Sequence, residues 1–193
     1  MTIQEQPGEL LVGAYHRVIN GCELVTYNQR SQKKGDQMEL DVLAIRSGNG
    51  AQTVYACEVI THIDGMLYVG SPKTDRWDDF GNKNYQRTLE RIWNKLEVDF
   101  KYVTDVFDSA DSYHLQLWSP VVPEGYRTEG LEVLGPELEE ELGARTKDDL
   151  RVDLVYNETY TEMINTLTQR ARIESGDTGN IAFRFLQILE NLR

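Results

Sequence analysis

The chain has 193 residues and 40% of them are hydrophobic, which is enough to bury one core of ordinary size. The formal net charge of -12 opposes non-specific binding of polyanions over the whole surface, because the average field repels phosphates, but it leaves room for a local basic site. No basic leader precedes an apolar stretch and no apolar run has the length of a bilayer span, so we expect a cytoplasmic protein without a membrane partner.

The first half of the chain predicts one helix and three strands. Residues 8 to 19 repeat apolar side chains at helical spacing, and Asn20-Gly21 ends that helix. Residues 22 to 30, 37 to 45 and 53 to 61 have the composition of strands, and short polar turns connect them, which favours an antiparallel meander. Cys22 and Cys57 lie in apolar segments without C-x-x-C spacing, so we expect free buried thiols.

The second half predicts more helix than strand. Residues 82 to 96 form a helix with a basic stripe, residues 100 to 107 and 113 to 120 read as strands, and residues 129 to 143 read as a helix. A short strand at 151 to 156 and helices at 158 to 173 and 180 to 192 follow. We therefore expect a single compact α/β domain, with a core over residues 1–120 and a C-terminal part over residues 121–193. The last two helices either pack on the sheet or form the seam of a homodimer.

Two acidic residues stand inside otherwise apolar strands. Asp41 and Glu58 would each cost several kcal/mol of desolvation, about the price of an unpaired buried charge, unless a cation meets them. Side chains alternate along a strand, so Glu39, Asp41 and Leu43 are expected on one face, and Glu58, Ile60 and His62 on one face of the next strand. Either a hard cation such as Mg²⁺ or Mn²⁺ joins the two carboxylates, or both face solvent or pair with lysine or arginine.

The order of these elements and motifs resembles the PD-(D/E)xK, or restriction-endonuclease-like, superfamily. The matching residues are Gly8-Glu9 on the first helix, Asn28-x-Arg30, Glu39-Leu40-Asp41 and Glu58-Val59. They look most like the branch that contains Holliday-junction resolvases and small bacterial endonuclease-like proteins, over about residues 8 to 100. The resemblance implies a helix, three-strand meander, helix and strand core with Glu9, Asp41 and Glu58 as catalytic residues that hold Mg²⁺ or Mn²⁺.

The sequence departs from that superfamily at the lysine two residues after the glutamate, because Ile60 stands there. Isoleucine can neither donate a hydrogen bond nor stabilise developing charge. His62 could ligate metal or accept a proton, or it is a polar residue at a strand end. Lys83 or Arg87 could reach back across the sheet, since the lysine migrates in sequence within the superfamily, or the stripe is a solvated helix face.

Two functions remain open at this stage. The first is an atypical metal-dependent nuclease whose nucleic-acid contacts come from Lys33, Lys34, Arg87 and Arg91, with His62 or Lys83 completing the catalytic set. The second is a catalytically silent relative that serves as a binding or regulatory module. The missing lysine and the net charge favour the silent module, whereas the retention of three costly carboxylates favours the nuclease.

Overall fold

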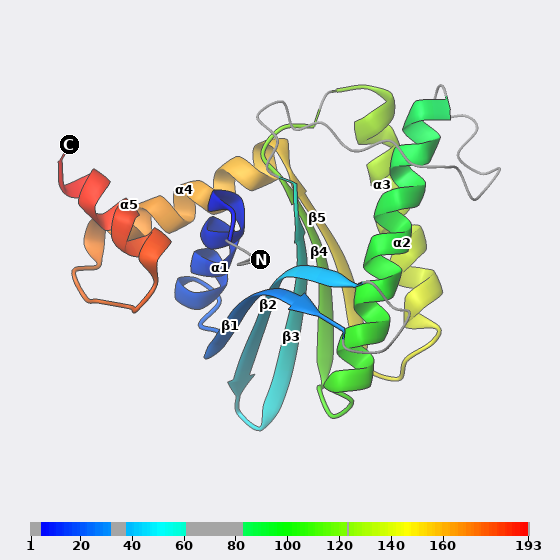
Figure 1. Ribbon diagram of the computed structural model, residues 1–193, viewed down its shortest axis with the longest axis horizontal. Coiled ribbons are helices and arrows are strands. Elements are labelled where there is room, and N and C mark those ends of the chain that lie inside the picture. Colours follow the sequence, from blue (N-terminus) through cyan, green and yellow to red (C-terminus); the bar gives the residue numbers. More distant parts are fainter. Residues whose placement is uncertain (1–4, 32–37, 61–82, 123, 193) are drawn as a thin grey trace.

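The computed structural model describes residues 5–31, 38–60, 83–122 and 124–192, and residues 83–87, 126 and 127 only in their backbone course. Five strands form one sheet and five helices cover it (Figure 1). The elements are α1 (Pro7–Val18), β1 (Leu24–Arg30), β2 (Glu39–Gly48), β3 (Ala51–Val59), α2 (Lys83–Val106), β4 (Ser112–Ser119), α3 (Tyr126–Gly143), β5 (Asp149–Tyr156), α4 (Asn157–Ile173) and α5 (Ile181–Asn191).

The sheet is mixed and its strands lie in sequence order. The β1, β2 and β3 strands pair antiparallel, which confirms the predicted meander, whereas β3, β4 and β5 pair parallel. Asn49 and Gly50 form the β2–β3 turn with φ values of 54° and 81°. Both residue types tolerate positive φ, and such a two-residue turn matches the twist of the paired strands. The parallel pairs need long connections, which α2 and α3 provide.

Each face of the sheet buries its own core. The α2 and α3 helices cover one face with a core that includes Leu89, Leu96, Leu131 and Leu138. The α1, α4 and α5 helices lie on the opposite side, where Val12, Leu167 and Phe183 belong to the second core. Figure 1 shows the sheet edge-on between these two groups of helices. The expected α/β class is therefore confirmed, with both faces of the sheet covered.

The predicted strand at residues 100 to 107 is wrong, because α2 continues through Val106. The β-branched and aromatic residues of this segment suggested a strand. Instead Leu96, Phe100 and Val103 keep the helical spacing and bury the same side of the helix in the core shared with α3. Burial of that continuous stripe outweighs the local propensity for extended backbone.

The two C-terminal helices pack on the molecule, as one of the two alternatives predicted. The α4 helix buries Leu167 and Ala171 beside α1, and α5 buries Phe183 in the same core. Among the helices that the structure describes, none is long and apolar enough to cross a membrane. Both cysteines are buried and free, which agrees with the expected thiols.

Candidate functional site

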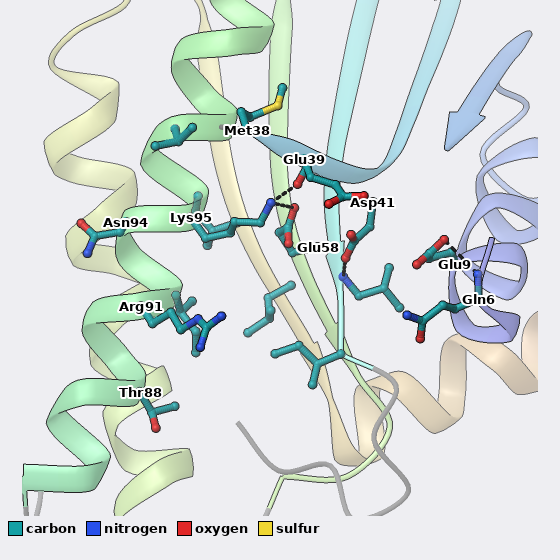
Figure 2. Close-up of a pocket in the computed structure, with 16 residues that line it drawn as sticks. Gln6, Glu9, Met38, Glu39, Asp41, Glu58, Thr88, Arg91, Asn94 and Lys95 are labelled. Carbon is teal, nitrogen blue, oxygen red and sulfur yellow. Dashed lines mark hydrogen bonds and ion pairs between the residues drawn. The ribbon is translucent and has the colours of Figure 1, made fainter. Parts of the chain in front are cut away.

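A cleft of about 690 Å³ opens between the start of α1, the strands β2 and β3, and the middle of α2. Its lining contains all three acidic residues singled out in the sequence, which are Glu9, Asp41 and Glu58. Lys95 and Arg91 enter from α2 on the opposite side (Figure 2). The cleft thus gathers residues from α1, the β2–β3 hairpin, α2 and, through Leu117, β4.

Glu9 occupies the first turn of α1 and is held on two sides. Its Oε2 atom accepts a hydrogen bond from the backbone N–H of Gln6 at 3.0 Å, so it closes the helix N-terminus. The same oxygen accepts a hydrogen bond from Asn28 Nδ2 at 3.2 Å. Burial and the nearby charge of Asp41 raise the pKa of Glu9 in spite of these two hydrogen bonds. Two hydrogen bonds therefore fix the direction of the Glu9 carboxylate, and the negative charge of Asp41 lies close to it.

Asp41 lies where the regular pairing of β2 and β3 stops. The β2–β3 pairing ends at Val42 and Cys57, and Asp41 Oδ2 accepts the N–H of Val59 at 2.8 Å. The expected alternation fails at this point, because Leu40 and Leu43 both belong to the core on the α2 side. The prediction that Glu39, Asp41 and Leu43 share one face is therefore wrong. The side chain of Asp41 takes the place of a strand-to-strand hydrogen bond, and the strand changes face around it.

Strand β1 is distorted at the same level of the sheet. Asn28 has a φ of 51°, and its neighbours Tyr27 and Gln29 pair with Val42 and Leu40 on either side of Asp41. Asparagine is one of the few residues that tolerate this left-handed conformation. The distortion coincides with the hydrogen bond from Asn28 to Glu9. A local irregularity in two strands thus orients two of the three carboxylates.

Glu58 points to α2 and meets a cation there. Lys95 Nζ lies 3.0 Å from Glu58 Oε1 and 3.9 Å from Asp99 Oδ1, one helical turn further on. Lys95 also donates a hydrogen bond to the main-chain carbonyl of Glu39. Figure 2 shows the lysine side chain extended from α2 across to the strands. The cation expected opposite a buried strand carboxylate is therefore Lys95.

The carboxyl groups of Glu58 and Asp99 lie near enough that each shifts the pKa of the other. Burial and the charges of Asp99 and Asp41 raise the pKa of Glu58 well above its ordinary value. Burial also raises the pKa of Asp99, against the opposing effect of Lys95. The pair therefore keeps a proton at a pH where exposed carboxylates have lost theirs.

The neighbouring carboxyl groups keep Lys95 positively charged. Burial by itself would lower the pKa of Lys95, but Glu58 and Asp99 outweigh burial and raise it. Lys95 is thus protonated throughout the physiological range. Lys95 faces several acidic groups, which are Glu58, Asp99 and Asp41, so the site keeps an excess of acidic over basic side chains.

The structure brings together some of the predicted site residues and leaves others undescribed. Glu9, Asp41, Glu58 and Arg91 all line the cleft. Ile60 lines it as well and packs against the core on the α2 side, the same side as Glu58. His62, Lys33 and Lys34 lie outside the described residues, as do the side chains of Lys83 and Arg87.

Sequence reasoning missed Asp99 and did not select Lys95 from its stripe. The basic stripe of the predicted helix consists of Lys83, Arg87, Arg91 and Lys95. Nothing in their four-residue spacing distinguishes Lys95 from the other three. Asp99 escaped attention because it falls between the predicted end of the helix at Leu96 and the predicted start of a strand at Phe100. A lysine and an aspartate at i and i+4 on one helix form an ion pair, and this signal becomes visible once α2 is extended.

The cysteine beside Glu58 takes part in a separate cluster on the other face of the sheet. Cys57 Sγ lies 3.3 Å from His16 Nε2, which in turn lies 3.0 Å from Gln116 Oε1. Burial raises the pKa of Cys57 and lowers the pKa of His16 to about 4. Both groups are therefore neutral, and the cluster has the character of a satisfied polar network in the core, not of an activated thiol.

The chemistry of the cleft residues suits a hard divalent cation bound by a small number of carboxylates. Among the described residues, no group of three or more acidic, histidine or cysteine side chains converges on one point. Mg²⁺ needs only one or two carboxylates, since it keeps several of its waters. No nitrogen or hydroxyl group of the described chain donates a hydrogen bond to either oxygen of buried Asp99. Excess buried carboxylate with unfilled acceptor sites on Asp99 is compatible with a bound cation.

Comparison of the chain with protein-family models, curated proteins and solved structures finds no match.

Proposed function

We propose that the cleft hydrolyses phosphodiester bonds of nucleic acid with the help of a divalent metal ion. The observation behind this proposal is the position of Lys95, 3.0 Å from Glu58 in the cleft that Asp41 and Glu9 also line. The missing lysine at Ile60 was the main argument for a silent protein. Lys95 of α2 lies beside Glu58, where a lysine at position 60 would also be expected to reach. The isoleucine at position 60 therefore no longer counts against catalysis.

The arrangement of elements supports the same proposal. Helix, three antiparallel strands, helix and a parallel fourth strand follow one another as in the core that the PD-(D/E)xK resemblance implies. The three acidic residues come from α1, β2 and β3, the same elements that supply them in that superfamily. The β5 strand and the helices α3, α4 and α5 extend this core at one edge and on both faces.

Asp41 and Glu58 are proposed to hold the metal ion, and Glu9 faces the same space from α1. A bound Mg²⁺ or Mn²⁺ lowers the pKa of water and offsets the negative charge of a reacting phosphate. Lys95 places a permanent positive charge beside Glu58, where it can bind a phosphate oxygen or the attacking water. Asn28 fixes the direction of the Glu9 carboxylate through its hydrogen bond. Arg91 lies on the same side as Lys95 and is exposed, so it suits contact with the nucleic-acid backbone.

A second candidate function is a binding module that keeps the fold without cleavage. Lys95 already pairs with Glu58, and Asp41 already accepts the N–H of Val59. In that case these two partners stabilise the two buried carboxylates and no metal is needed. The two candidates differ in one measurable property, which is the affinity of the cleft for a divalent cation.

The test is a Mn²⁺ titration of the full chain by calorimetry or water-proton relaxation. We expect saturable binding at one or two sites that Asp41→Asn removes and that Asp108→Asn, at an exposed position outside the cleft, leaves unchanged. Cleavage of labelled single-stranded and duplex DNA and RNA is then screened in Mn²⁺, with Lys95→Ala as the variant that should lose cleavage. Binding with no cleavage of any substrate would favour the binding module, and no binding up to millimolar Mn²⁺ would overturn the metal-dependent proposal.

A further inference from the structure

Helix α5 presents a row of uncovered apolar side chains. Ile181, Phe185, Ile188 and Leu192 are 79%, 60%, 52% and 79% exposed, and we call these four residues the α5 seam. Single exposed apolar residues are common on protein surfaces, but a continuous row along one helix marks an interaction site. The seam therefore requires an explanation that the fold of one chain does not supply.

The orientation of α5 is fixed, so the seam cannot turn inward. The opposite side of the helix buries Phe183 in the core, and Asn180 caps the helix by accepting the N–H of Phe183 at 2.9 Å. Gln187 is buried on the same side and donates to the carbonyl of Gly176 at 3.1 Å, and also to that of Glu174. One face of α5 is thus satisfied by its own chain, and the seam is the other face.

The spacing of the seam is that of a helix that packs along another helix. Its residues follow one another at intervals of four, three and four, which is the a/d pattern of paired helices. The row is also close to symmetrical about its midpoint, with Ile181 opposite Leu192 and Phe185 opposite Ile188 in an antiparallel pair. A two-fold axis places the same surface on both partners, and this row is complementary to itself.

The charge of α5 also suits a second copy. The whole chain carries a net charge of -12, so two copies repel one another over most of their surfaces. From Ile181 to Leu192 the only charged residues are Arg184 and Glu190, one of each sign. Glu190 lies about 180° around the helix from Ile181, so no acidic side chain of α5 faces the seam and the contact brings no carboxylates together.

From these observations we propose that α5 pairs antiparallel with α5 of a second copy of this chain, so that the protein forms a two-fold homodimer through the α5 seam. At roughly 100 Å² of apolar surface per side chain, the seam and half-exposed Leu189 would bury on the order of 500 Å² on each copy. A standard stable interface buries about 800 Å² on each partner. The dimer is therefore expected to dissociate on dilution.

The proposed dimer does not depend on the proposed function. In Figure 1 α5 lies at the opposite end of the molecule from α2, which forms one wall of the cleft. None of the four seam residues lines the cleft. A dimer that failed to form would leave the nuclease proposal standing, and a dimer without metal binding would leave this inference standing.

The first experiment measures the mass of the full chain by sedimentation velocity and by light scattering, from low to high micromolar concentration. We expect the mass to rise from one chain to two, and Ile188→Glu to weaken association at least tenfold. The control is Val106→Glu, at a valine that is 51% exposed on α2 outside the seam, and it should behave as the wild type. Circular dichroism checks that both variants keep their helical content.

A second experiment tests the antiparallel geometry. Ile181→Cys and Leu192→Cys are prepared separately, mixed and oxidised, with the native cysteines buried. Antiparallel pairing puts the two positions side by side only in the mixture, since identical positions lie about 16 Å apart along the axis. Cross-links in each variant alone but not in the mixture would overturn the geometry. A wild type that stays monomeric, which would leave the seam to another protein or a lipid surface, or an Ile188→Glu variant that still dimerises, would overturn the proposal.

Discussion

Replacing Lys95 by methionine removes the cation of the cleft and keeps most of the volume of the side chain. In the wild type the ammonium lies 3.0 Å from Glu58 Oε1, and the Glu58 side chain is only 10% exposed. With an effective dielectric constant of about 20, the attraction at this distance is about 5 kcal/mol. The Lys95 side chain is 34% exposed, so solvent screens part of that attraction. We expect Lys95→Met to lower the free energy of unfolding by about 2 kcal/mol at pH 8.

The loss should depend on pH in a defined direction. Without Lys95, the pKa values of Glu58 and Asp99 rise further, because burial and their mutual repulsion are no longer opposed. The folded Lys95→Met variant then binds more protons than its unfolded chain over a wider range of pH than the wild type does. Its stability therefore falls more steeply with rising pH. At pH 5 both carboxyl groups can be protonated, and the difference from the wild type should shrink to less than about 1 kcal/mol.

Urea unfolding at pH 5 and pH 8, followed by circular dichroism, measures both quantities. Lys101→Met is the matched control, because Lys101 is exposed on the same helix and faces away from the cleft. Its effect should stay within about 0.5 kcal/mol at either pH. Equal stability of the two variants at pH 8 would refute the assignment of Lys95 as the counter-ion of Glu58. A loss of equal size at both pH values would refute the raised pKa values of Glu58 and Asp99.

Two further predictions concern single positions. The pKa of Asp99 rises from its ordinary 3.8 to about 7, which corresponds to at most about 4 kcal/mol of lost stability once Asp99 is ionised. The folded chain binds the extra proton, so stability is greatest below pH 4 for this group and is lost as pH rises towards 7. Asp99→Asn should flatten this part of the stability–pH curve, and an unchanged slope would contradict the shift. Gly13 packs so closely on Tyr27 that an added Cβ would lie 2.2 Å from the tyrosine hydroxyl. Gly13→Ala should therefore lower the free energy of unfolding by about 1 to 3 kcal/mol, whereas Gly143→Ala, with open space around it, should be neutral or slightly stabilising. Equal thermal midpoints for these two variants would contradict the close packing.

Local patterns in the sequence were sufficient for most of the elements. The Asn49-Gly50 turn, the strands on both sides of it and the amphipathic first helix follow from residue preference and periodicity. The end of α2 could not be predicted in this way, because residues 100 to 107 are rich in the β-branched and aromatic residues that favour strands. Only contact with α3 and the sheet shows that Phe100 and Val103 continue a helical stripe.

The candidate site shows the same division. The sequence by itself determined that Glu9 lies on the first helix and Asp41 and Glu58 on the second and third strands, and that a buried strand carboxylate needs a cation. It also supplied four cations on the next helix without a reason to prefer one of them. Tertiary structure decided the partner, because the burial of Leu89, Leu96 and Phe100 against the sheet sets the rotation of α2 about its axis. That rotation directs Lys95 to Glu58 and brings Asp99 into the same buried space. The phase of a helix against a sheet is a property of packing between distant segments, so no local pattern could specify it.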